Sequence, residues 1–140
     1  MFGELRVSDR DDVCIVDLVA EPFASLDRPQ RRTIDDAVIA VDSMHEILVA
    51  KLTALLGRTE LRDLVDVQAL VDAGTDLIAA LRDAPKKGAG FSAMTLAWVL
   101  HAFNPEPLGR ALGWSEAQVA GVEAFRTQLI DRLTEISRPT

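Results

Sequence analysis

The sequence contains no tyrosine, one cysteine and few aromatic residues of any kind. Aromatic residues make up 5% of the 140 positions, which argues against a surface on which successive nucleic-acid bases stack. Cys14 alone excludes an internal disulfide and a cysteine-based zinc site, and the two histidines, His45 and His101, lie far apart. No apolar run approaches the roughly 20 residues that span a bilayer, and the acidic start does not resemble a secretory signal. We therefore expect a reduced, cytoplasmic protein without a membrane segment.

The charge balance of the sequence is acidic. The sequence has 15 lysines and arginines and 22 aspartates and glutamates, which gives a net charge of -7. Such a surface repels a phosphate backbone, so we do not expect binding of bulk nucleic acid. The overall acidic balance still allows one local basic pocket. Hydrophobic residues make up 49% of the chain, and a chain of this length buries about two-thirds of its unfolded surface. A sizeable core is therefore expected.

The first 42 residues have the pattern of β-strands. Glu4–Ser8 alternates polar and apolar residues, and Ala37–Val41 is a short apolar run. Val13–Ala20 is nearly continuous in its hydrophobicity, which is typical of a strand covered on both faces, and it contains one carboxylate, Asp17. We therefore expect two or three strands.

The chain after Asp42 has the pattern of about five helices. Ser43 and Glu46 fit a capping box, in which the glutamate reaches back to the start of the helix, and Ser115 with Gln118 fits a second one. Expected helices span about 43–58, 60–73, 75–84, 92–103 and 115–137, with a flexible basic loop at 86–90. Strands followed by helices predict an α+β fold with a β segment at 1–42 and a helical domain at 43–140.

Two consecutive predicted helices each direct charges toward apolar neighbours. In the first helix, Lys51 lies in the apolar stripe, Arg58 follows on the same face, and Glu46 falls on the solvent side. In the second helix, Asp63 shares a face with apolar residues, and Asp66 is spaced to pair with Arg62. Two interpretations remain open: an ion pair of Asp63 with Lys51 or Arg58 that fixes the helix hairpin, or side chains that meet a ligand.

The same residues resemble a known sequence block. Ser43–Arg58, followed by Arg62-Asp63-Leu64-Val65-Asp66-Val67, is similar to a segment of the AbiEii/AbiGii toxin family, the nucleotidyltransferases of abortive-infection and toxin–antitoxin systems. That family carries a glutamate, then Lys-Leu-x-Ala-Leu, an arginine, and Arg-Asp-x-x-Asp-Leu at this spacing. The resemblance covers about 25 residues strongly, and the order of strands before helices agrees with it.

The resemblance implies roles for five residues. Lys51 would face the nucleotide phosphates as a point charge, and Asp63 would be needed for activity. Arg58 and Asp66 would support the nucleotide pocket. Asp17 would correspond to the third carboxylate of the nucleotidyltransferase sheet, or it is an ordinary polar residue of an edge strand.

The sequence departs from the family at the metal motif. That motif is a Gly-Ser turn followed by an Asp-x-Asp pair that holds magnesium, and the chain has no Gly-Ser pair. Asp9-Arg10-Asp11 has the Asp-x-Asp pattern but falls in a predicted turn. We therefore assign no metal ligand in this sequence.

We therefore expect a partial or degenerate nucleotidyltransferase that keeps a phosphate subsite and is not catalytically complete alone. It would use Mg²⁺ and a nucleoside triphosphate only when a partner completes the site. The alternative is a non-enzymatic helical module for protein interaction or oligomerisation. Both hypotheses predict a homo-oligomer or a protein partner, because an incomplete sheet leaves an open edge.

Overall fold

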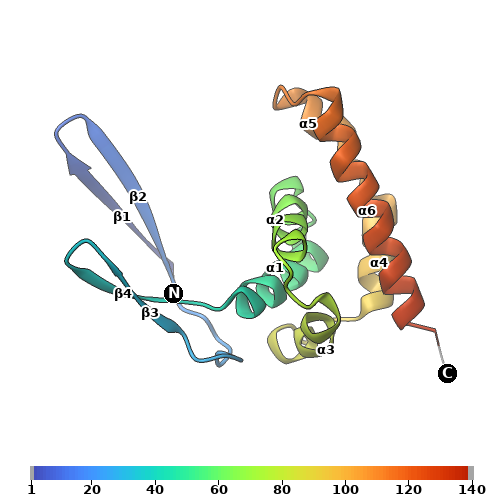
Figure 1. Ribbon diagram of the computed structural model, residues 1–140, viewed down its shortest axis with the longest axis horizontal. Helices are drawn as coiled ribbons and strands as arrows, with labels where there is room; N and C mark the ends of the chain where they lie inside the picture. The colour runs from blue at the N-terminus through green and yellow to red at the C-terminus, as the bar shows by residue number, and fades with distance from the viewer. Residues whose placement is uncertain (1, 139–140) are drawn as a thin grey trace.

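The structure, a computed structural model that describes residues 2–138, has strands first and helices after them. The strands are β1 (Phe2–Asp9), β2 (Asp12–Val19), β3 (Gln30–Ile34) and β4 (Ala37–Val41). The helices are α1 (Met44–Arg58), α2 (Leu61–Asp72), α3 (Leu77–Lys87), α4 (Ala93–Ala102), α5 (Glu106–Ala111) and α6 (Glu116–Ile136). Figure 1 shows the strands on one side of the molecule and the helices on the other. The predicted α+β class is confirmed, and the prediction missed β3 and the short helix α5.

The strands form two separate antiparallel ribbons rather than one sheet. β1 pairs with β2 and β3 pairs with β4, each through a two-residue turn. Arg10 in the first turn and Asp35 in the second have positive φ angles of 54° and 50°, a backbone conformation typical of tight hairpin turns. The expected turn at Asp9-Arg10-Asp11 is therefore confirmed.

The prediction that the second strand is covered on both faces is wrong. All eight residues of β2 are exposed, and Asp17 is exposed with them. Within residues 2–138, β2 pairs only with β1, and the ribbon stands away from the helices (Figure 1). The apolar run that suggested a buried strand is therefore apolar surface in this structure.

The helices contain the hydrophobic core. α1 packs against α2 and α3, while α4 and α5 pack against α6, which also contacts α2. Eight leucines are completely buried there: Leu48, Leu52, Leu55, Leu64, Leu96, Leu100, Leu129 and Leu133. They come from α1, α2, α4 and α6, so one core joins these helices. No helix between residues 2 and 138 has both the length and the apolar content needed to cross a membrane.

A tight turn joins α1 to α2 and orients their charged residues. Thr59 closes α1 in the left-handed conformation with φ of 44°, which is uncommon for a β-branched residue. Its N–H and its hydroxyl group both donate to the carbonyl oxygen of Leu55, at 3.1 and 2.8 Å. These two bonds offset the strain, and they bring the last residue of α1, Arg58, close to the first turn of α2.

The ends of α1 and α3 differ from the prediction. Ser43 is the N-cap of α1 as expected and accepts a hydrogen bond from the N–H of Glu46, but the Glu46 side chain does not reach back to it. The expected end of α3 before Pro85 is also wrong, because the helix continues through Lys87. Pro85 lacks an N–H, so the last turn of α3 loses only one backbone hydrogen bond. Lys87 at the end of the helix forms an ion pair with Glu46.

Candidate functional site

Four charged side chains from α1 and α2 form one ion cluster, which we call the α1–α2 cluster. The Lys51 ammonium lies 2.9 Å from Asp63 Oδ1 and 2.6 Å from Asp66 Oδ2. Arg58 donates from Nε to Asp63 Oδ2 at 2.9 Å and from Nη2 to Asp63 Oδ1 at 3.3 Å. The structure therefore brings together all four residues that the sequence predicted on these two helices.

Asp63 is the buried centre of the cluster. Its side chain has no exposed surface, and both of its oxygens accept hydrogen bonds from cations. Burial alone would raise the pKa of Asp63, but the hydrogen bonds and charges of Lys51 and Arg58 outweigh it and hold the pKa below its ordinary value. Asp63 is therefore ionised at neutral pH and fixes the positions of two cations.

The cations reach the surface, whereas Asp63 does not. The Lys51 side chain is 25% exposed, that of Arg58 is 50% exposed, and that of Asp66 is 41% exposed. Burial would lower the pKa of Lys51, yet its hydrogen bonds to Asp66 and Asp63 raise it above the ordinary value. The cluster thus presents a charged ammonium and guanidinium at its outer rim, together with one partly exposed carboxylate, Asp66.

The expected pair of Arg62 and Asp66 is absent from the described residues. Arg62 lies 3.7 Å from Glu60 instead, and Asp66 turns toward Lys51. Lys51 of α1 is held beside Asp63, and there it also reaches Asp66. Asp66 therefore pairs with a cation of the neighbouring helix instead of with Arg62 of its own helix. The ion pair expected as one alternative is present, with both Lys51 and Arg58 as partners of Asp63.

Asp17 does not join the cluster. It lies on the exposed strand β2 directly opposite Glu4, and no hydrogen bond or ion pair connects it to Lys51 within residues 2–138. The described residues also contain no group of three or more histidine, cysteine, aspartate or glutamate side chains placed to hold a metal ion. The carboxylates that are close together, Asp63 and Asp66, already accept bonds from Lys51.

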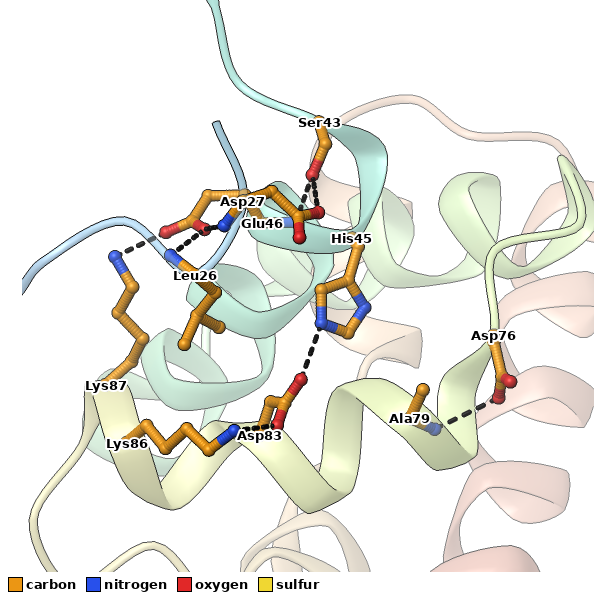
Figure 2. Close-up of polar contacts among 10 residues, drawn as sticks. All are labelled: Leu26, Asp27, Ser43, His45, Glu46, Asp76, Ala79, Asp83, Lys86 and Lys87. Atoms are coloured by element: carbon orange, nitrogen blue, oxygen red, sulfur yellow. Dashed lines mark hydrogen bonds and ion pairs between the residues drawn. The ribbon is translucent and has the colours of Figure 1, made fainter. Parts of the chain in front are cut away.

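A second polar network holds the other side of α1 (Figure 2). Glu46 was expected on the solvent side, but it is buried, with 4% of its surface exposed. Its Oε2 accepts hydrogen bonds from the backbone N–H groups of Leu26 and Asp27, at 2.7 and 3.2 Å. Its Oε1 forms an ion pair with Lys87, whose side chain is also buried. The loop between β2 and β3 is therefore tied to both α1 and α3.

Two more contacts reinforce this network, and neither was predicted. The hydroxyl group of Ser43 donates to Asp27, and His45 lies 2.9 Å from Asp83, which also accepts a bond from Lys86 at 2.6 Å (Figure 2). The expected flexible basic loop at 86–90 is thus wrong for its two lysines, because both belong to α3 and both are paired.

Burial shapes the pKa of Glu46 much as it shapes that of Asp63. Desolvation would raise the pKa, but the Lys87 ammonium and the N–H groups of Asp27 and Leu26 lower it below the ordinary value. Beside this network lies a cavity of about 610 Å³ between the end of β2, the following loop and α1, with Glu46 and Lys87 in its wall. Glu46 therefore holds the loop after β2 against α1.

We predict that Asp63→Asn destabilises the fold far more than Asp66→Asn. An amide at position 63 cannot accept charged hydrogen bonds from both Lys51 and Arg58, and such bonds contribute about 1.5–3 kcal/mol each. Asp66 is partly exposed and its pair with Lys51 should contribute about 0–1 kcal/mol. Urea unfolding of both variants measures the difference, and equal losses would contradict a central role for Asp63.

We predict that acid weakens the fold through Asp63 and Glu46. Both pKa values are lowered in the folded chain, so their stabilisation is complete above the unfolded values of about 3.9 and 4.3 and disappears as pH falls through the folded values. The free energy of unfolding should fall below about pH 4.5.

Glu46→Gln should flatten this dependence, while Glu116→Gln, at a residue with a 90% exposed side chain, should leave it unchanged. Unfolding curves recorded between neutral pH and acid provide the comparison. The same slope in all three proteins would show that Glu46 does not contribute.

Comparison with known proteins places the chain in a family. The sequence matches the family model described as "Nucleotidyl transferase AbiEii toxin, Type IV TA system" over residues 7–135, which is nearly the whole chain. No curated protein and no solved structure gave a match. The matched region includes both ribbons' turns, the α1–α2 cluster and the Glu46 network. The chain therefore belongs to the AbiEii nucleotidyltransferase toxin family of type IV toxin–antitoxin systems.

Proposed function

We propose that this chain is a nucleotidyltransferase-type toxin that binds nucleoside triphosphate at the α1–α2 cluster and cannot complete transfer alone. The observation that carries the proposal is the position of Lys51, whose ammonium is held by a buried carboxylate while a quarter of its side chain stays exposed. Membership in the family implies use of Mg²⁺ and a nucleoside triphosphate, and a toxin–antitoxin system implies a cognate antitoxin.

In this proposal the phosphates replace Asp66 on Lys51. Asp66 is 41% exposed, so its carboxylate can rotate into solvent at little cost when a more highly charged anion approaches. Lys51 would keep its bond to Asp63 and direct its remaining donors toward the phosphate oxygens. The charge of the ammonium then offsets the negative charge of the triphosphate.

Arg58 would supply the second contact. Its guanidinium has five N–H donors, and the bonds to Asp63 use two of them, on Nε and Nη2. Half of the side chain is exposed, so the other donors can reach an anion. Asp63 has no exposed surface and is therefore a positioning residue, which holds both cations in place but does not touch the nucleotide.

The described residues do not fit a magnesium site. The Asp63 oxygens are occupied by cations, Asp17 lies on the exposed ribbon, and no cluster of three potential ligands occurs within residues 2–138. Two metals held by carboxylates stabilise the entering and leaving oxygens in this kind of transfer. We therefore propose that the metal ligands lie outside residues 2–138, and that this chain supplies nucleotide contacts.

A second candidate function, a non-enzymatic interaction module, is favoured by a different observation. Large apolar side chains are exposed along both ribbons, among them Leu5, Ile15 and Ile39. Contiguous exposed apolar surface marks an interaction site. Under this hypothesis Lys51 and Asp63 serve only to join α1 to α2, and no nucleotide binds.

Thermal unfolding with each nucleoside triphosphate and Mg²⁺ separates the two functions. A nucleotide present at 100 times its dissociation constant stabilises the folded state by about 2.7 kcal/mol, which raises the midpoint measurably. The rise should disappear in Lys51→Ala and persist in Lys86→Ala, which removes an exposed lysine of α3. Asp66→Asn should bind at least as tightly as the wild type, because the competing carboxylate is gone.

Each variant is compared with its own midpoint without nucleotide, so a loss of stability does not imitate a loss of binding. No rise with any nucleotide in the wild type would support the interaction module. A rise that survives in Lys51→Ala would place the nucleotide elsewhere and contradict the proposed site.

A further inference from the structure

The first ribbon has an unpaired edge along β1. Within residues 2–138, β1 pairs with β2 and with no other strand. An isolated two-stranded ribbon is marginally stable in water, and the free backbone groups of its edge can pair with another strand. The strand β1 is therefore open to pairing along its outer side.

The register of the ribbon separates its two faces. Gly3, Leu5 and Val7 lie opposite Leu18, Val16 and Cys14, so this face is apolar along its middle. Leu5, Val7, Val16 and Leu18 are all exposed. A sheet of more strands would extend this face into a larger apolar surface, whereas a lone ribbon leaves it in water.

The other face of the ribbon carries an unfavourable charge pair. Glu4 lies directly opposite Asp17, and like charges in that relation destabilise a sheet. Arg6, two residues along β1 on the same face, lies opposite Ile15, with Asp17 diagonally across the ribbon. In the described part of the chain, no ion pair involves Glu4, Arg6 or Asp17.

We propose that β1 pairs with β1 of a second copy of this chain, antiparallel, about a twofold axis that passes through Leu5. In this register Glu4 lies opposite the partner's Arg6, and by symmetry Arg6 lies opposite the partner's Glu4. The partner's Arg6 then lies near the carboxylates of Glu4 and Asp17. The two ribbons become one four-stranded sheet in the order β2-β1-β1-β2.

The charges select this register over its neighbours. Moving the axis to Glu4 places two glutamates opposite each other, and moving it to Arg6 places two arginines opposite each other. Moving the register by one residue aligns the apolar face of one ribbon with the charged face of the other. Among these registers, only the one centred on Leu5 places Glu4 opposite Arg6, which favours a second copy over an unrelated strand.

Cysteine cross-linking tests the register directly. In a Cys14→Ser background, Leu5→Cys puts two thiols on the twofold axis, where opposite Cα atoms of antiparallel strands lie about 4.5–5.5 Å apart, within disulfide range. Val7→Cys is the matched control, because it is on the same face but about 13 Å from its own copy. We expect a covalent dimer from Leu5→Cys and none from Val7→Cys under mild oxidation.

Charge reversal tests the contact without a new bond. Arg6→Glu puts like charges opposite each other at two places and should weaken the dimer about tenfold or more, as measured by light scattering over a range of concentrations. The exchanged variant Glu4→Arg with Arg6→Glu should restore it. A wild type that stays monomeric, equal cross-linking at both cysteines, or an exchanged variant as weak as Arg6→Glu would each overturn the proposal.

Discussion

The burial of Asp63 between Lys51 and Arg58 is the constraint on which the arrangement of α1 and α2 depends. A carboxylate without exposed surface is stable only when cations neutralise it, so the two side chains of α1 must lie where Asp63 requires them. The left-handed Thr59 makes this geometry possible by turning the chain sharply between the helices. The same constraint leaves the outer parts of both cations at the surface, where an anion can reach them.

Helix α1 is held by charges on two sides. The α1–α2 cluster fixes it to α2, and buried Glu46 fixes it to Lys87 of α3 and to the backbone of the loop after β2. The first contact orders the proposed phosphate subsite. The second holds the loop after β2 against α1 and α3. Between residues 2 and 138, no ion pair joins either ribbon to a helix, and the exposed apolar residues of the ribbons are the part of the structure that a partner would cover.

The sequence predicted what depends on local pattern and missed what depends on distant neighbours. The three-four spacing of α1 and α2 was enough to place Lys51, Arg58 and Asp63 on facing sides, because helical geometry converts spacing into direction. Glu46 could not be placed in this way, since its partners are backbone groups nineteen and twenty residues earlier and a lysine forty-one residues later. The apolar run of β2 predicted burial, but hydrophobicity alone does not say which surface covers a strand.

An NMR titration of the isotopically labelled chain with nucleoside triphosphate and Mg²⁺ tests most directly whether the α1–α2 cluster is a phosphate subsite. We expect the largest shifts at the Lys51 side-chain ammonium, the Arg58 guanidinium and the Asp66 carboxylate. The Asp63 carboxylate should remain ionised throughout, because it continues to hold both cations. Shifts confined to the ribbons, or no change at Lys51 at saturating nucleotide, would contradict the proposed site and leave the cluster with a purely structural role.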